Sequence, residues 1–304
     1  MSETKIKKGF FSGRKGKQRI FICAMLAFPI LHFLVFWLWV NVDGLLLPIK
    51  NNVGNWIGFE NFKWVFSRFL NGDANLDMWQ ATKNTLIFFA WGMFVELPIS
   101  VILAYVFFKK LPGGTFFTIC LYLPSIISAT VMTTIFKNCL GADGPIAWIF
   151  NSMGKKWVNP ITQDGTSIPS MLVYSLWNGY GLNIILFQSS MKRIPRELFE
   201  SASLDGITLW KELIYMVVPL IWPILTTKMI LSVAGIFGAS GPILLFTNGK
   251  YGTRTIGFVM YEQYKVYNQI ARAAAIGLLY TIIGLPLVFS SRWLAGKIGG
   301  EYEY

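Results

Sequence analysis

The sequence predicts an all-α, polytopic membrane protein that crosses the bilayer six times. Hydrophobic residues make up 54% of its 304 residues and charged residues only 14%, and the mean hydropathy is +0.51. This composition excludes an ordinary soluble domain. The apolar residues form continuous runs and do not alternate with polar ones, so the sequence also excludes a barrel of membrane strands.

Six apolar runs are each long enough to cross roughly 30 Å of hydrocarbon as a helix. They cover approximately residues 20–41, 84–108, 115–137, 168–190, 214–238 and 273–291. The third and fourth are less uniform, and Pro124 predicts a kink in the third. The first run is too long for a cleavable signal peptide, so we expect it to remain as an anchor. One transmembrane domain over residues 20–294, between tails 1–19 and 295–304, accounts for the chain.

Lys and Arg are unequally distributed between the two sides of the membrane. One side holds residues 1–19, 109–114, 191–213 and 292–304. About one residue in four on that side is basic, against about one in ten in the loops of the other side. The positive-inside rule therefore predicts that both termini and the 191–213 loop are cytoplasmic. Topology and contact with anionic lipid explain the net charge of +12, so nucleic acid is not an expected partner.

No enzyme chemistry is visible in the sequence, and we expect no catalytic residues. The chain contains no Gly-rich loop for nucleotide phosphates and no paired acid–base carboxylates. Its only histidine, His32, lies in the first apolar run without a Cys/His cluster, so no metal site is expected. If ATP drives this protein, another chain must hydrolyse it.

The loop between the fourth and fifth runs has an unusual sequence, FESASLDGITLWKELIYMVVP over residues 199–219. Pro195 suits the first turn of a short helix, and Asp205 with Gly206 is expected to end it. Thr208 is placed to cap a second helix that continues into the fifth run. Such a helix–turn–helix suits docking to a partner at the membrane surface. The alternative is an ordinary amphipathic connector.

This stretch resembles the EAA loop of ABC-importer permeases. The matching positions are Glu200, Ala202, Asp205, Gly206 and Pro219, while Ser201, Ile207 and Val218 depart conservatively from Ala, Ala and Leu. The preceding residues 194–198 are similar to the IP-x-E-L segment of the carbohydrate branch, the maltose or multiple-sugar type. The resemblance extends over nearly the whole chain, from the first run to the sixth.

The resemblance implies a permease subunit of a type I ABC importer for sugars or oligosaccharides in the plasma membrane of a prokaryote. It implies a second permease subunit, two ATPase subunits that bind ATP and Mg²⁺, and an extracytoplasmic solute-binding protein. It also implies that residues 195–213, here called the coupling loop, transmit ATPase motion to the spans through alternating access. The coupling residues would be Glu200, Ser201, Ala202, Asp205 and Gly206.

Candidate residues for a solute path lie in the second, third and fourth runs. Glu96 is the most costly residue to bury in a membrane, so it should face a cavity or a partner. It would then bind a sugar hydroxyl or make a gating contact, although a paired structural carboxyl is an equally good interpretation. Lys228 is interpreted as structural. The other candidates are Tyr122, Ser125, Tyr174, Trp177, Asn178 and Asn183. These residue types also join transmembrane helices, and in maltose-type importers the partner permease can make the main substrate contacts.

Two alternatives remain open from the sequence. The first is an ABC permease for another solute, such as a phosphorylated glycerol or a peptide, because the loop does not identify the solute. The second is an ion-coupled secondary transporter. That class needs acidic residues within the membrane, for which Glu96 is the one strong candidate, and it gives the coupling loop no role.

Overall fold

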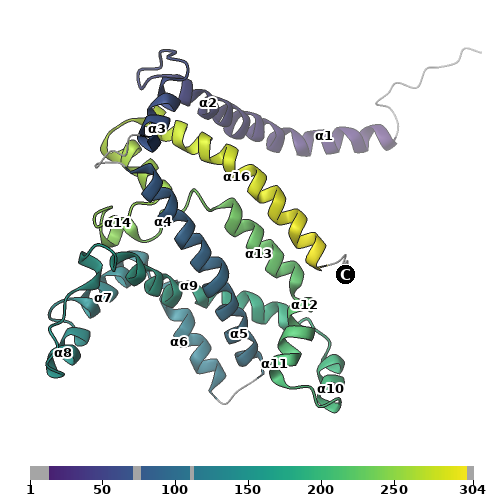
Figure 1. Cartoon of the computed structure of the whole chain (residues 1–304). Helices are drawn as coiled ribbons and strands as arrows, with labels where there is room; N and C mark the ends of the chain where they lie inside the picture. Colours follow the sequence, from purple (N-terminus) through teal and green to yellow (C-terminus); the bar gives the residue numbers. More distant parts are fainter. Residues whose placement is uncertain (1–13, 71–76, 110–112, 300–304) are drawn as a thin grey trace, which may run out of the picture.

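The described part of the chain, residues 14–70, 77–109 and 113–299, is built from helices and contains no β-strand beyond one isolated bridge between Lys50 and Trp56. This computed structural model confirms the all-α fold class (Figure 1). Three helices are long and apolar enough to cross a membrane, and two bent helix pairs qualify when each pair is counted together. The basic residues Lys5, Lys7 and Lys8 and the last five residues lie outside the described part.

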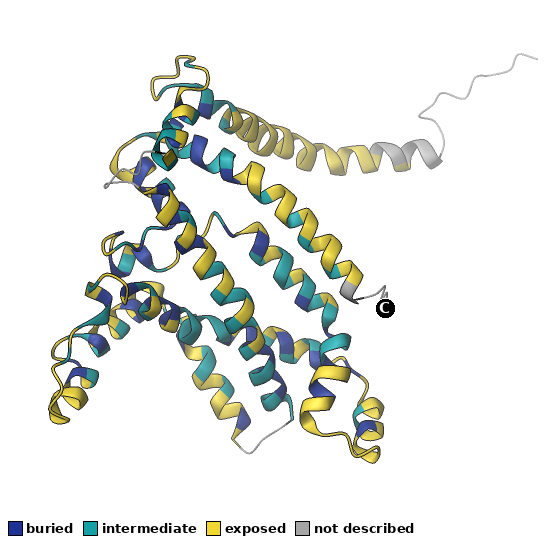
Figure 2. Ribbon diagram, viewed as in Figure 1, coloured by how far each residue is buried: buried dark blue, intermediate teal, exposed yellow. Residues whose placement is uncertain are grey.

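The first apolar segment lies apart from the rest of the bundle and contacts mainly the last helix (Figure 1). It consists of α1 (Arg14–His32), a π-helical stretch η1 (Phe33–Trp39), α2 (Val40–Leu46) and η2 (Leu47–Ile49). The expected span 20–41 is confirmed, although the apolar segment extends over Phe21–Ile49. None of its most apolar stretch is buried against this chain, so bilayer or another subunit must cover it (Figure 2).

The second span is longer than the sequence predicts, because its helix begins six residues earlier. It comprises α4 (Met78–Trp91), the π-helical turn η3 (Gly92–Glu96) and α5 (Leu97–Phe108). The Asp77 carboxylate accepts a hydrogen bond from the Gln80 amide at 3.0 Å and caps the helix. Residues 78–83 are less apolar than the rest, which is why hydropathy places the start at residue 84.

The third predicted span, 115–137, is wrong as a single helix. It divides into α6 (Gly114–Ile126) and α7 (Ala129–Leu140), and the chain turns by 106° between them before continuing into α8 (Pro145–Ser152). Pro124 lacks an amide hydrogen and weakens the last turn of α6. The Ser128 hydroxyl then accepts a hydrogen bond from the Val131 amide and starts the new helix.

The fourth span is α9 (Ser167–Met191), a single helix of 25 residues that matches the expected 168–190. Its polar residues make it less apolar than the helices that qualify as spans on hydropathy alone. It packs against α5 and α6, and it approaches α6 closely at Gly181. A Cβ at Gly181 would lie 2.7 Å from the Leu121 carbonyl oxygen, so only glycine permits this crossing.

The fifth predicted span, 214–238, is also wrong as one straight helix. The helical segment α11 (Leu209–Glu212), η5 (Leu213–Val217) and α12 (Val218–Leu220) bends by 72° at Ile221 before α13 (Trp222–Ala234). Prolines 219 and 223 lie on either side of the bend and remove helical hydrogen bonds. The sixth span, expected over 273–291, is confirmed as part of the longer α16 (Ile270–Gly299).

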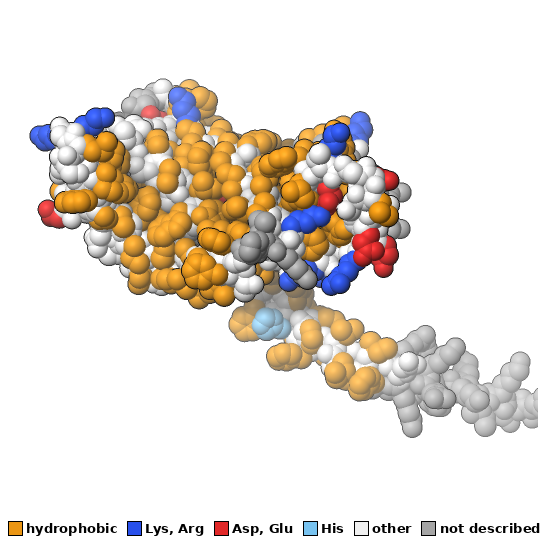
Figure 3. All heavy atoms as spheres, turned by 90° about the horizontal axis from the view of Figure 1, so that it is seen from below, with side chains coloured by type: hydrophobic (Ala, Val, Ile, Leu, Met, Phe, Trp, Pro, Cys, Tyr) orange, Lys and Arg blue, Asp and Glu red, His pale blue; other side chains and the backbone are white. Residues whose placement is uncertain are grey.

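The two ends of the molecule differ in their elements (Figure 1). One end holds α10 (Arg196–Leu204), α11, the start of α1 and the end of α16. The opposite end holds α3 (Glu60–Leu70), α7, α8 and α14 (Ile243–Phe246). On the face seen in Figure 3, charged side chains gather toward these ends and a broad hydrophobic band separates them. This distribution fits a bundle that lies across a bilayer.

The segment between the fifth and sixth expected spans, residues 239–272, contains three short helical pieces but no further span. They are α14, α15 (Ile256–Tyr261) and the π-helical turn η6 (Glu262–Val266). An ion pair between Arg254 and Glu262, 2.9 Å from Nε to Oε2, ties the loop before α15 to η6. The side chains of Ile243, Ile256 and Phe258 are buried. The segment therefore packs against the bundle at one of its ends.

Candidate functional site

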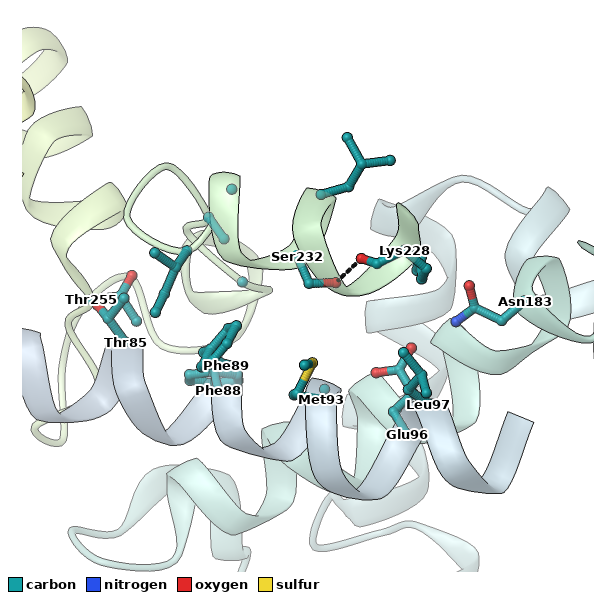
Figure 4. Close-up of a pocket in the computed structure, with 16 residues that line it drawn as sticks. Thr85, Phe88, Phe89, Met93, Glu96, Leu97, Asn183, Lys228, Ser232 and Thr255 are labelled. Atoms are coloured by element: carbon teal, nitrogen blue, oxygen red, sulfur yellow. Dashed lines mark hydrogen bonds between the residues drawn. The ribbon is translucent and has the colours of Figure 1, made fainter. Parts of the chain in front are cut away.

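A cavity of about 350 Å³ lies inside the bundle between the second and fifth spans (Figure 4). Its wall combines aromatic and thioether side chains with hydroxyl, amide and charged groups. The labelled lining residues are Thr85, Phe88, Phe89, Met93, Glu96, Leu97, Asn183, Lys228, Ser232 and Thr255. Apolar walls with a few convergent polar groups are typical of a small-molecule site.

Glu96 reaches this cavity because the helix around it is irregular. It is the last residue of η3, and Pro98 follows in the first turn of α5, where it cannot donate a helical hydrogen bond. A Cβ on Gly179 of α9 would overlap the Glu96 carboxylate, 2.8 Å from its Cδ. The glycine therefore makes room for the carboxylate, which is half-buried between α9 and the cavity.

Lys228 and Ser232 line the same cavity from α13, opposite the helix that carries Glu96 (Figure 4). The Ser232 hydroxyl donates a hydrogen bond to the Lys228 carbonyl oxygen at 2.9 Å. Within the described residues, the side chains of Glu96 and Lys228 form no ion pair with each other or with another residue. An acidic and a basic side chain thus line one space between two spans.

Asn183 and two threonines add neutral hydrogen-bonding groups to the wall. The Asn183 amide donates to the Gly179 carbonyl oxygen at 3.3 Å, which holds the side chain beside the Glu96 contact. Thr85 bridges two segments, because its hydroxyl donates to Ala81 and accepts from the Ile256 amide at 3.0 Å. Hydroxyls, amides and aromatic faces in one space suit a polyhydroxylated solute, whose polar edges need hydrogen bonds and whose flat faces stack.

The coupling loop folds as the predicted helix–turn–helix. The amide of Gly206 donates to the Ser203 carbonyl, and the amide of Ile207 donates to the Ala202 carbonyl, both at 3.1 Å. This pair of hydrogen bonds is a Schellman motif, in which Gly206 occupies the left-handed position with φ +67°. Thr208 stands at the N-cap of α11, but its side chain makes no capping hydrogen bond.

The faces of the coupling loop differ sharply in exposure. Ala202 is buried against the bundle, whereas Glu200, Ser201, Asp205 and Gly206 are exposed. Large apolar side chains are exposed beside them: Leu204 at 90%, Leu209 at 61% and Trp210 at 62%. An apolar surface of this kind on a projecting element is typical of a protein contact site.

Two contacts that the sequence did not single out fix the coupling loop to the end of α5. Lys109 forms an ion pair with Glu212, whose side chain is almost fully buried. Phe199 of α10 packs on Phe108, with ring centroids 5.3 Å apart, and the Lys109 ammonium lies over the same Phe199 ring. No local sequence signal could have found these contacts, because the partners in each are about a hundred positions apart.

Most of the chain matches one protein family. The family described as "Binding-protein-dependent transport system inner membrane component" matches residues 96–300, which include Glu96, the coupling loop and the last four spans. The chain belongs to this family. It is therefore the membrane-spanning component of a transport system, and the expected resemblance to importer permeases is confirmed.

Several curated relatives of this inner membrane component are named as sugar permeases. The arabinooligosaccharides transport system permease protein AraP of Bacillus subtilis (strain 168) is 26% identical over 282 residues, which cover 90% of this chain and 87% of the relative. The multiple sugar-binding transport system permease protein MsmF of Streptococcus mutans is 26% identical over 276 residues, covering 86% and 91%. The likeness thus extends over nearly the full length of both proteins.

Solved structures confirm the fold of the inner membrane component. A chain of a bacterial ABC transporter involved in the import of the acidic polysaccharide alginate superposes with a TM-score of 0.80 at 23% identity, covering 94% of this chain and 98% of that chain. A second structure, of the bacterial alginate transporter in complex with its alginate pentasaccharide-bound periplasmic protein, gives a TM-score of 0.81 at 22% identity. At this identity the likeness shows a shared permease fold.

The structure brings only two of the predicted path residues, Glu96 and Asn183, into the cavity of this inner membrane component. Tyr174 and Trp177 lie instead in an aromatic cluster with Phe136 and Phe246, where Tyr174 is buried and accepts a hydrogen bond from Thr133 at 3.3 Å. The cluster packs the first half of α9 against α7 and α14. Whether these rings also touch solute stays a prediction.

Tyr122, Ser125 and Asn178 also lie outside the cavity wall. The Ser125 hydroxyl donates to the Tyr122 carbonyl oxygen at 2.7 Å, at the close crossing of α6 with Gly181 of α9. The buried Oδ1 of Asn178 accepts no hydrogen bond from the described residues. Gly179 is not among the residues predicted for the path. Lys228, which is interpreted as structural from the sequence, lines the cavity.

Proposed function

We propose that this chain is one of two permease subunits of an ATP-driven ABC importer for a sugar or oligosaccharide. The observation that carries the proposal is the cavity between the second and fifth spans, in a chain whose family transports solutes delivered by binding proteins. Relatives named for arabinooligosaccharides and for multiple sugars support a carbohydrate over a peptide or a phosphorylated glycerol.

The proposed assembly contains a second permease, two ATPase subunits and an extracytoplasmic solute-binding protein. ATP and Mg²⁺ belong to the ATPase subunits in this proposal. The solved alginate transporter in complex with a sugar-bound periplasmic protein supports the binding protein as a partner. The exposed apolar side chains Leu204, Leu209 and Trp210 support a protein contact at the coupling loop.

The proposed topology places both termini and the coupling loop in the cytoplasm of a prokaryotic cell. The excess of basic residues on that side supports this orientation. The grouping of α10, α11, the start of α1 and the end of α16 at one end of the molecule supports it as well (Figure 1). The coupling loop would then lie where an ATPase has access to it.

The proposed mechanism is alternating access. Closure of the ATPase dimer moves the coupling loop, and the Lys109–Glu212 pair and the Phe108–Phe199 contact pass this motion to α5. Because α5 continues from the helix that carries Glu96, the same motion changes the cavity. ATP and the sugar-loaded binding protein drive the change only through different affinities for the two states.

Transport by reconstituted vesicles tests the proposal. The assembled transporter is reconstituted with ATP on the coupling-loop side and a sugar-loaded binding protein on the other side, and uptake of labelled arabinooligosaccharides is measured. We expect uptake only when ATP and binding protein are both present. Uptake driven by an ion gradient alone contradicts the proposal and favours a secondary transporter.

A further inference from the structure

A second cavity, of about 660 Å³, lies beside the coupling loop and outside the proposed solute path. It is bounded by the end of α5, the first turns of α6, the end of α9 and the start of α10. The residues that matter for its chemistry are Thr115, Thr118, Gln188, Lys192, Arg196 and Phe199. None of these residues lines the first cavity, so the second cavity would bind a different ligand.

The polar wall of the second cavity favours an anion. Lys192 and Arg196 are both exposed, and neither forms an ion pair within the described part of the chain. Among the described residues, no Asp or Glu lines the cavity. Gln188 and two threonines supply neutral hydrogen-bonding groups, and the Thr118 hydroxyl already donates to the Gly114 carbonyl at 2.8 Å. Two cations with hydroxyl and amide groups form the chemistry that binds a phosphate group.

The apolar wall of the same cavity favours a ligand with hydrocarbon chains. Phe107, Phe108 and Ile119 line it alongside the polar groups. Outside it, Phe116 is 66% exposed and Phe117 is 53% exposed, so the outer face of α6 is open to lipid. A free phosphate ion has no apolar part that could pack on this surface. Acyl chains that continue from a bound headgroup would cover it.

We propose that this cavity binds the headgroup of an anionic phospholipid from the membrane leaflet on the side of the coupling loop. Lys192 and Arg196 pair with the phosphate, and the acyl chains run along α6. Basic pockets between transmembrane helices at this level are suited to anionic headgroups. Because Phe199 and Arg196 both belong to α10, the bound lipid also joins the coupling loop to α6.

The test uses the assembled transporter, purified through a tag on this chain, stripped of lipid and titrated with phosphatidylglycerol in a background of phosphatidylcholine. Native mass spectrometry counts bound phosphatidylglycerol. We expect Lys192→Gln combined with Arg196→Gln to lower binding at least fivefold. The matched control combines Arg193→Gln with Lys211→Gln, which removes two exposed charges from the same end of the molecule but none from the cavity. The control should bind as the unmodified transporter does.

A second variant separates loss of charge from loss of folding. Lys192→Arg with Arg196→Lys keeps both charges, so it should retain phosphatidylglycerol, and each variant is checked for assembly by gel filtration. Equal binding by the Gln variant and the control overturns the proposal. Displacement of the lipid by millimolar inorganic phosphate assigns the cavity to free phosphate instead. If the Gln variant binds lipid normally but loses the co-purified ATPase, the two cations belong to the ATPase contact. That result also overturns the proposal.

Discussion

The Nζ of Lys109 lies 2.5 Å from the Oε1 of Glu212, and this ion pair joins the end of the second span to the start of the fifth. The Glu212 side chain is 6% exposed, and the Lys109 side chain is 29% exposed. The Lys109 ammonium also lies 4.9 Å from the centre of the Phe199 ring. Lys109 therefore contacts both helices of the coupling loop, which makes it the link between α10, α11 and α5.

Breaking this ion pair should weaken coupling more than assembly. Lys109→Met leaves the Glu212 carboxylate without its partner in a nearly buried position, at a cost on the order of 2 kcal/mol. That estimate is below the value for a fully buried pair because Lys109 is partly open to solvent. We expect solute-stimulated ATP hydrolysis to fall several-fold in the assembled complex, measured in reconstituted vesicles.

Exchange of the two charges provides the control for that experiment. Lys109→Glu with Glu212→Lys restores opposite charges across the same gap, and it should recover part of the activity that each single variant loses. Lys211→Met removes a neighbouring exposed charge and should have little effect. Full activity in Lys109→Met would show that the pair plays no part in coupling.

The cost of a substitution at Gly206 should depend on how readily the new residue adopts a left-handed backbone conformation. The structure leaves open space around a Cβ at Gly206, so the cost comes from its φ of +67° and not from a clash. Gly206→Val should cost about 1–2 kcal/mol and lower co-purification of the ATPase, while Gly206→Asn should be milder because Asn adopts left-handed backbone more readily. Equal co-purification by Gly206→Val and the unmodified chain would reduce the loop to a simple connector.

Glu200→Ala should weaken ATPase binding without changing the shape of the loop. The residue is exposed on α10, and its carboxylate has no ion-pair partner within the described part of this chain. Loss of one charged contact with a partner is expected to lower affinity roughly tenfold or less. Titration of the permease complex with purified ATPase measures this affinity. Glu60→Ala, at the start of α3 at the opposite end of the molecule, is the control and should leave this affinity unchanged.

Gly179→Ala should displace the Glu96 carboxylate and alter uptake. The new methyl group would overlap Glu96, so the carboxylate must move into the cavity or the α9 backbone must shift. We expect uptake to fall at least tenfold with the complex still assembled. Gly296→Ala, in α16 with open space around its Cβ, should leave uptake unchanged. Normal uptake by Gly179→Ala would show that solute passage does not depend on the position of the Glu96 carboxylate.

Asn183→Ala and Trp177→Ala should separate a cavity residue from a packing residue. Asn183 lines the cavity, so its loss should lower uptake at a normal level of assembled complex. Trp177 packs on Phe136, so its loss should lower assembly as well, by removing a half-buried ring worth on the order of 2–3 kcal/mol. The ratio of uptake to complex in the membrane distinguishes the two. A lowered ratio for Trp177→Ala would instead assign its ring to the solute path.

Much of the fold follows from the distribution of apolar residues along the chain, whereas the breaks in the helices do not. Long apolar runs require helices in a membrane, and each of the six expected spans contains a long helix or a bent helical pair, although α9 is not apolar enough to qualify as a span on hydropathy. The break at Ser128 and the bend at Ile221 depend on which hydrogen bonds replace those that proline removes. Hydropathy averaged over a span does not indicate which hydrogen bonds form there.

The candidate site could be predicted only where a residue is unusual by itself. Glu96 stands out because a carboxylate is costly within an apolar run. Its neighbour Gly179 and the opposing Lys228 come from other spans, so their relation to Glu96 depends on how the helices pack. The coupling loop was predictable because a turn signal, Asp205–Gly206, is local and acts through the backbone.

Because the coupling loop turns through a Schellman motif, its backbone conformation does not depend on its exposed side chains. The turn is held by main-chain hydrogen bonds to the Ala202 and Ser203 carbonyls and by one glycine, so the exposed side chains around it do not hold the bend. Evolution, or an engineer, can therefore exchange Leu204, Leu209 and Trp210 to match a different motor protein while the angle between the two helices is preserved. A graft of these side chains should thus leave the geometry of the turn unchanged.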